Sequence, residues 1–362
     1  MLIGIDGNEA NITHRVGVNQ YAFGLLHALS SLKSNHSFII YLKAPALPDM
    51  PPETTGWQYR IIPFPKLWTQ TRLPWDLFFH QPRPDVFFSP SHYAPRWSPV
   101  PTVISIMDLG FLQSPEQFTS KDFNQLKNWT AYSANRATKI ITISEFTKKD
   151  VLTTYHRLPE DVTVTYPGYD PEFYKSTPDV NVLKRLHITK PYVLFLGSLK
   201  PSKNVEGLIS AFNNLQDKRL KLVIAGKKAW LYDKIFSLVQ DLKLSDRIIF
   251  TGFVPDADVP ALMSLAEVFI LPSFYEGFGI PVLEAMSCKT PVVVSRIASL
   301  PEVAGPAGVY VNPVKPDSIT EGIQKALKNK DKLSKLGLIQ AKKFSWDKTA
   351  GQTIKVLQSV KM

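Results

Sequence analysis

Two glutamates, Glu276 and Glu284, stand with seven residues between them in a segment rich in glycine and proline. Gly277 and Gly279 permit tight backbone turns, and Pro281 fits the first turn of a helix, where its missing N–H costs nothing. The free N–H groups at such a helix start form a seat for an anion such as diphosphate. The carboxylates would accept hydrogen bonds from hydroxyls at opposite ends of a long ligand, one on a sugar ring and one on a ribose. The alternative, two solvated or ion-paired glutamates, explains the glycines and proline less well.

Length and composition set the broad class. The chain has 362 residues, 44% hydrophobic and 20% charged, which suggests two domains with separate cores. Its single cysteine, Cys288, excludes a disulfide scaffold and a thiolate zinc cluster. No apolar run approaches the ~20 residues of a membrane helix. Asp6 follows the apolar start Met1–Ile5 without a basic leader, so we expect a cytoplasmic protein.

The formal charge of +11 is unevenly placed. Residues 1–170 carry 15 basic and 14 acidic side chains, whereas residues 171–362 carry 27 and 17. Ten lysines stand against three acids from Glu321 onward. A basic surface suits nucleic acid, anionic lipid or phosphorylated ligands alike, and a solvated helical face is the plainer interpretation. No base-stacking motif accompanies the charge, so we expect no nucleic acid partner.

Metal binding is not expected either. The seven histidines show no ligand spacing. Asp256 and Asp258 resemble a metal-binding acid pair, but they precede a helix, where acids commonly act as caps.

Strand-length apolar runs alternate with helical patterns throughout, which indicates an α/β protein with parallel sheets. Turn-rich sequence from Tyr166 to Asp179 separates two such series, so we predict domains at 1–170 and from 191 onward, joined by a linker at 171–190. Helices are expected at Gln20–Ser31, Val205–Phe212, Leu231–Leu242 and Val282–Ser287, and Ser144 as a helix N-cap. The predicted strands are Leu2–Asp6, Ser37–Leu42, Tyr59–Pro63, Val86–Ser89, Thr102–Met107, Lys139–Ile143, Val162–Thr165, Tyr192–Leu196, Lys221–Ala225, Arg247–Phe250, Val268–Leu271, Pro291–Val294 and Gly308–Val311.

The segment with the two glutamates, PSFYEGFGIPVLEAM at 272–286, resembles glycosyltransferase family 4, and the resemblance covers nearly the whole chain. It implies the GT-B fold: two Rossmann-like α/β/α domains, donor side at 191–342, facing each other across a deep cleft. A C-terminal helix at 343–362 would return to the N-terminal, acceptor-side domain. The other matching segments are IDG at 5–7, DVFF at 85–88, TISEF at 142–146, YPG at 166–168, FLGSLKPSKN at 195–204, LVIAG at 222–226, IFTGFV at 249–254, CKTPVV at 288–293, SLPEV at 299–303 and FSWDKTA at 344–350.

The resemblance also implies residue roles. Glu284 would hold the ribose of a nucleotide donor and Glu276 the transferred sugar. Lys203 would neutralise the diphosphate leaving group, a role that fits the negative charge released there; a solvent-exposed lysine is its plainer interpretation. Donor contacts are further implied for the loop glycine Gly17, for Ser198, for Phe253 and Val254 at the base, and for the backbone of Phe278, Gly279 and Ile280.

Two positions depart from the family pattern. Ser198 stands where an arginine or similar diphosphate donor is usual, and it brings no charge. Met107 precedes Asp108 where many members have a His-Asp pair, so the histidine's role does not transfer. Asp108 is then a candidate for acceptor or sugar hydroxyls, or simply a cap of the turn before Leu109–Gly110.

The expected function is retaining, metal-independent hexosyl transfer from a nucleotide diphosphate sugar, without a cofactor. GDP-mannose is the first donor expected and a UDP-sugar the second. The acceptor would be a glycan or lipid-linked intermediate, and the latter would place the enzyme at the inner membrane face. The alternatives are an epimerase of the same fold and a nucleotide-sugar-binding protein without transfer activity. A phosphorylase would need a longer chain.

One aromatic segment is left open. Trp68, Trp75, Phe78 and Phe79, with Lys66 and Arg72, would form either a basic aromatic surface at a membrane or part of the core. Pro74 interrupts any long helix there.

Overall fold

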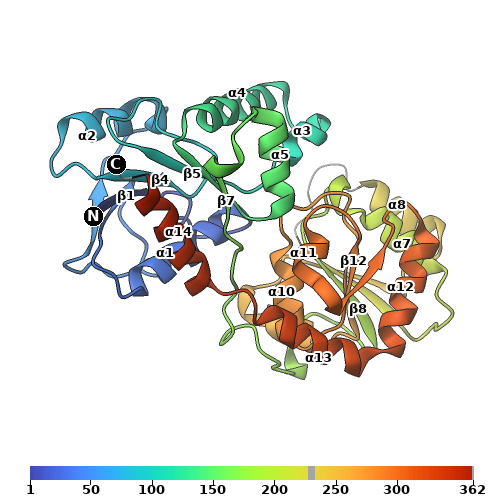
Figure 1. The fold of residues 1–362 in the computed structure, drawn as a ribbon. Helices are drawn as coiled ribbons and strands as arrows, with labels where there is room; N and C mark the ends of the chain where they lie inside the picture. The colour runs from blue at the N-terminus through green and yellow to red at the C-terminus, as the bar shows by residue number, and fades with distance from the viewer. Residues whose placement is uncertain (227–232, 361–362) are drawn as a thin grey trace. The chain divides into compact units, whose positions relative to one another are not determined.

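The computed structural model describes residues 1–226 and 233–360, which fold into two compact units (Figure 1). The first unit comprises Met1–Gly168 and Ser345–Met362, and the second comprises Tyr169–Phe344. Each is built on one parallel sheet with helices packed around it, which confirms the predicted α/β class.

The first unit contains a seven-stranded sheet in the order β3-β2-β1-β4-β5-β6-β7. The strand order reverses between β1 and β4, which are hydrogen-bonded neighbours. Such a switch point is where parallel sheets commonly bind ligands, at the carboxyl ends of the strands. The strands are β1 (Leu2–Asp6), β2 (Ser37–Leu42), β3 (Trp57–Ile61), β4 (Val86–Ser89), β5 (Thr102–Ile106), β6 (Lys139–Thr142) and β7 (Val162–Val164), and the α-helices are α1 (Val18–Ser31), α2 (Leu73–Phe79), α3 (Gly110–Gln113), α4 (Ser120–Arg136), α5 (Glu145–Tyr155) and α14 (Trp346–Ser359).

The second unit repeats the plan with a six-stranded sheet in the order β10-β9-β8-β11-β12-β13. Its switch point lies between β8 and β11, which pair in parallel. The strands are β8 (Tyr192–Leu196), β9 (Lys221–Ala225), β10 (Ile248–Gly252), β11 (Val268–Leu271), β12 (Val292–Ser295) and β13 (Gly308–Val311), and the α-helices are α6 (Val180–Arg185), α7 (Val205–Asn213), α8 (Asp233–Asp241), α9 (Val259–Leu265), α10 (Ile280–Ser287), α11 (Leu300–Ala304), α12 (Pro316–Lys328) and α13 (Lys330–Ala341).

Helix α14 joins the first unit, where it lies beside α1 (Figure 1). The indole of Trp346 packs against the ring of Tyr21, with centroids 6.0 Å apart. Gly24 leaves room for this indole, since a Cβ there would lie 2.4 Å from it. The hydroxyl of Thr349 donates to the carbonyl of Tyr166 at 2.6 Å. The predicted return of the C-terminal helix to the N-terminal domain therefore has a specific packing basis.

Residues 171–190, predicted as a linker, belong to the second unit instead. Val182 and Leu183 of α6 are buried, and α6 packs against α9. Arg185 also forms an ion pair with Asp258 at 2.6 Å. The turn-forming residues that suggested a linker therefore precede a helix with its own apolar contacts.

Most predicted strands agree with the structure, and β3 is the clearest shift. It spans Trp57–Ile61 rather than Tyr59–Pro63 because the Trp57 side chain is buried, whereas Pro63 has no N–H to donate to a neighbouring strand. The hydroxyl of Ser144 accepts from the N–H of Thr147, so the predicted N-cap is confirmed. The helix predicted at Leu231–Leu242 begins in residues outside the described part, and its described portion is α8.

Candidate active site in the second unit

Lys203 and Glu276 form an ion pair at the carboxyl edge of the second sheet. Lys203 ends a short 3-10 helix (η4, Pro201–Lys203) after β8, and Glu276 lies in the loop after β11. Because β8 and β11 are neighbouring strands, the loops that follow them lie side by side. Lys203 Nζ is 2.5 Å from Glu276 Oε1. Two residues predicted separately are therefore brought into direct contact at the switch point.

Backbone contacts hold the two loops together. The N–H of Phe274 donates to the carbonyl of Ser202 at 2.8 Å. Asn204, buried and in the left-handed region with φ of 55°, donates through Nδ2 to the carbonyls of Pro272 at 3.1 Å and Pro313 at 2.7 Å. The asparagine side chain thus joins the loops after β8, β11 and β13. Sequence reasoning passed over Asn204, because its partners are 68 and 109 residues away in the chain.

Two serines fix Glu276. Its side chain is only 10% exposed, and Ser273 Oγ donates to the same Oε1 at 2.7 Å. Ser299 Oγ lies within hydrogen-bonding distance of the backbone carbonyls of Glu276 and Phe278, at 2.9 and 3.0 Å. Both serines are fully buried. The carboxylate is therefore held in one orientation before any ligand arrives.

Replacing Ser273 with alanine is expected to lower kcat roughly tenfold, because a buried carboxylate loses one of its two donors and one source of orientation. The matched control is Ser295→Ala, since the Ser295 hydroxyl is also buried but has no hydrogen-bond partner in the described structure. Steady-state kinetics of both variants make the comparison. Equal rates for the two variants would assign Ser273 a purely structural role.

Helix α10 begins at Ile280, two residues before the predicted start at Val282. Gly279 precedes it with φ of 101°, and a Cβ there would lie 2.9 Å from the Leu300 side chain, so this position requires glycine. Pro281 occupies the first turn. No side chain caps the helix start at Gly279. The backbone N–H groups of the first turn are therefore not occupied by a capping side chain, as an anion seat requires.

Glu284 lies one turn into α10 and is buried. Burial raises the pKa of this carboxyl to about 7, the hydrogen bond from Tyr174 opposes the shift, and the negative charge of Asp256 adds to it. The carbonyl of Tyr174 accepts from Ser287 Oγ at 2.5 Å, which anchors the tyrosine to the same helix. Tyr174 lies in the segment predicted as a linker, which is why it was missed. Glu284 and Tyr174 thus form a pair of titratable side chains near the predicted diphosphate seat.

The remaining predicted donor residues differ in exposure. Ser198 is half-buried just after β8. Phe253 is 49% exposed, whereas the neighbouring Val254 is buried. Phe278 packs edge-on against Phe344 with ring centroids 5.7 Å apart, so its side chain belongs to the core. Only the backbone of Phe278 is then suited to a ligand, as the sequence analysis assigned it.

Two of the predicted site residues, Gly17 and Asp108, belong to the first unit. Gly17 precedes α1 with φ of 55°, and a Cβ at this position would meet nothing within 4 Å. Asp108 Oδ1 accepts from the N–H of Gly110 at 2.8 Å, which is the turn-capping alternative. Sequence reasoning gave no role to Asp6, the last residue of β1, or to Glu9, which follows that strand. Burial raises the pKa of both carboxyls, and the charge of Asp6 raises that of Glu9 further.

Within residues 1–226 and 233–360, no three His, Cys, Asp or Glu side chains gather as a metal site would require. Asp258 instead pairs with Arg185. In the same described ranges, no helix has the length and apolar character needed to span a bilayer.

Two parallel-sheet α/β units and a C-terminal helix that joins the first unit are the architecture of GT-B glycosyltransferases. The sequence profile "Glycosyltransferase Family 4" matches residues 16–173, and "Glycosyl transferases group 1" matches residues 184–343. The O-antigen chain mannosyltransferase B of Escherichia coli is 31% identical over 278 residues, covering 74% of this chain and 73% of that protein. The chain therefore belongs to glycosyltransferase family 4, and it is a hexosyltransferase of glycan assembly.

Solved structures agree with the fold. A sucrose-phosphate synthase from Thermosynechococcus elongatus has a TM-score of 0.76 at 19% identity, covering 99% of this chain and 98% of the other. HepE of Anabaena, solved in complex with UDP, has a TM-score of 0.74 at 19% identity and covers 99% of both chains. At this identity the likeness concerns the fold alone.

Proposed function

We propose that this chain transfers a mannosyl residue from GDP-mannose to a hydroxyl of a glycan or lipid-linked acceptor, with retention at the anomeric carbon. The observation that carries the proposal is the pairing of Lys203 with Glu276 beside the open start of α10. The name of the E. coli relative, a mannosyltransferase, supports mannose as the sugar. The UDP bound by HepE makes a UDP-sugar the second candidate donor.

Different residues bind different parts of the donor. The ionised carboxylate of Glu284 accepts hydrogen bonds from the ribose hydroxyls, and the N–H groups at the start of α10 hold the diphosphate. Glu276, whose described contacts both fall on Oε1, presents its other oxygen to the sugar hydroxyls. Lys203 then faces both the sugar-binding carboxylate and the leaving group.

In the proposed scheme, sugar transfer depends on stabilising the negative charge that forms on the leaving diphosphate. As the bond between the anomeric carbon and the diphosphate oxygen breaks, both bonding electrons pass to the diphosphate, and the ammonium of Lys203 stabilises that charge. The acceptor hydroxyl attacks from the same face of the sugar and passes its proton to the departing diphosphate. The products are the glycoside and a protonated nucleoside diphosphate, and no protein nucleophile is consumed. No metal ion or cofactor takes part in this scheme.

Calorimetric titration with GDP, UDP, ADP and TDP is expected to give micromolar binding for GDP alone, and GDP-mannose should then support transfer that persists in EDTA. Selective UDP binding would replace GDP-mannose by a UDP-sugar. Loss of transfer in EDTA would overturn metal independence. Tight binding without transfer to any acceptor would favour a nucleotide-sugar-binding protein, and no binding at all would reject the donor site.

A further inference from the structure

The aromatic segment left open by the sequence divides into one buried and several exposed side chains. Trp68 is 2% exposed, and its Nε1 donates to the carbonyl of Ile62 at 2.9 Å. Trp75, Phe78 and Phe79 of α2 are 52%, 40% and 71% exposed. Of the sixteen exposed large hydrophobic side chains in the described part of the chain, six lie between Ile61 and Phe79. Core packing therefore explains Trp68 and leaves this concentration of apolar surface unexplained.

The three exposed rings of α2 form one cluster, called here the α2 surface. The rings of Trp75 and Phe79 have centroids 5.7 Å apart, and those of Phe78 and Phe79 are 6.3 Å apart. The guanidinium of Arg72 lies 5.0 Å from the Trp75 ring, and the His80 ring is 5.1 Å from it. The cluster thus combines large apolar rings with the Arg72 guanidinium and the His80 imidazole at its border.

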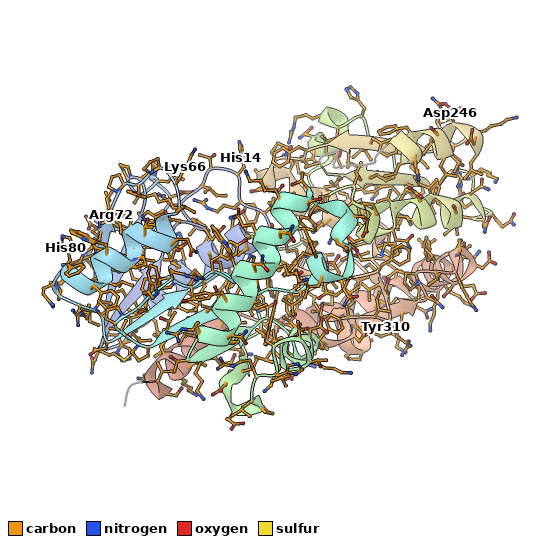
Figure 2. All side chains as sticks on the ribbon, turned by 90° about the horizontal axis from the view of Figure 1, so that it is seen from above. His14, Lys66, Arg72, His80, Asp246 and Tyr310 are labelled. Atoms are coloured by element: carbon orange, nitrogen blue, oxygen red, sulfur yellow. The ribbon has the colours of Figure 1, made fainter. Side chains whose placement is uncertain are left out.

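The exposed charges around the α2 surface are those of Lys66 and Arg83, and both are positive. Between residues 60 and 83 the chain carries Arg60, Lys66, Arg72 and Arg83 against one acid, Asp76. Asp76 is 1% exposed and lies within 3.6 Å of nitrogens of Arg60, Arg72 and His80, so its charge is already matched. Figure 2 shows the labelled Lys66, Arg72 and His80 along α2 and the segment before it.

We propose that the α2 surface docks this enzyme on an anionic phospholipid bilayer. Tryptophan and phenylalanine beside arginine and lysine are typical of helices that lie in the membrane interface, where rings enter the acyl boundary and cations meet headgroups. The unmatched positive charge favours a lipid surface over a second copy of this basic chain. This docking proposal rests on the lipid-linked acceptor of the proposed function. It does not depend on which nucleotide sugar is the donor.

The test is sedimentation of the full chain with phosphatidylglycerol-containing vesicles and with pure phosphatidylcholine vesicles, without nucleotide. The wild type is expected to bind the anionic vesicles, and more weakly as salt rises. Trp75→Ala with Phe79→Ala should weaken this binding at least tenfold, and Lys66→Glu should weaken it severalfold. Nucleotide binding by calorimetry should stay unchanged in these variants, which separates failure of the docking proposal from failure of the donor site.

Matched controls exclude other surfaces. Phe118→Ala removes an exposed ring shortly after α3 in the chain and should leave vesicle binding unchanged. Figure 1 shows α3 and α2 at opposite ends of the first unit. Lys332→Glu with Lys335→Glu reverses two exposed charges of the lysine-rich α13. Vesicle binding that depends on these lysines and not on Trp75 and Phe79 would overturn the proposal. So would a self-association of the wild type that the Trp75 and Phe79 substitutions abolish while vesicle binding persists.

Discussion

Lys203→Ala is expected to slow sugar transfer by about a hundredfold or more, the loss typical of removing one preorganised charge-stabilising donor. The lysine is positioned before donor binding, since Asn204 anchors its backbone and Glu276 holds its ammonium at 2.5 Å. The bare nucleotide should bind only a fewfold more weakly, because the leaving-group charge is largest during bond cleavage. Pre-steady-state transfer rates and calorimetric titrations measure the two effects separately.

Lys200→Ala is the matched control for this substitution. Lys200 is exposed and stands three residues earlier in the same loop. Its removal changes the local net charge equally, so a general electrostatic effect would slow both variants to the same extent. Equal rates for Lys203→Ala and Lys200→Ala would reduce Lys203 to a surface lysine and would remove the main support for the leaving-group role.

The sheets were predictable because buried parallel strands appear in sequence as short apolar runs. Tyr192–Leu196 and Val268–Leu271 coincide with β8 and β11. Their adjacency in the sheet was not visible in the sequence, because it depends on the strand order in space. Strand ends were less predictable near aromatic and proline residues. Strand β3 starts at the buried Trp57 and ends before Pro63, which lacks an N–H.

The candidate site was predicted as separate residues rather than as contacts. Glycine and proline chemistry around Glu276 and Glu284 is local, so it can be read directly from the sequence. The Lys203–Glu276 pair spans 73 residues, and the Asn204 contacts span 68 and 109, so only the fold brings them together. Tyr174 illustrates a further difficulty. Its turn-forming neighbours led to the prediction of a linker, whereas its side chain contacts buried Glu284. Long-range polar contacts therefore account for what the sequence analysis missed.

The two glutamates are both buried but have different partners, Lys203 for Glu276 and Tyr174 for Glu284, and their expected roles differ as well. Glu276→Gln should lower kcat about a hundredfold and leave the affinity for bare nucleotide nearly unchanged, because the proposed function assigns its carboxylate to the sugar. Glu284→Gln should weaken nucleotide binding at least tenfold, because in the proposed function the ribose would lose a charged acceptor. Calorimetry with nucleotide alone and kinetics with the sugar nucleotide distinguish them. Equal losses in both measurements for both variants would contradict this division.

Glu284→Gln is also expected to stabilise the unliganded protein above pH 7. Burial raises the pKa of Glu284 from 4.5 to about 7, so the folded chain holds a proton that the unfolded chain releases. The stability from that proton is complete below about pH 4.5 and is lost as the pH rises through 7. Glutamine has no charge to bury, so the variant should gain roughly 3 kcal/mol over the wild type at pH 8. Urea unfolding from pH 5 to 8 measures this difference. A variant that is less stable than the wild type at pH 8 would show that Glu284 is ionised and well paired in the free enzyme. The expected gain would mean that the buried carboxylate lowers the stability of the free enzyme and is kept for nucleotide binding.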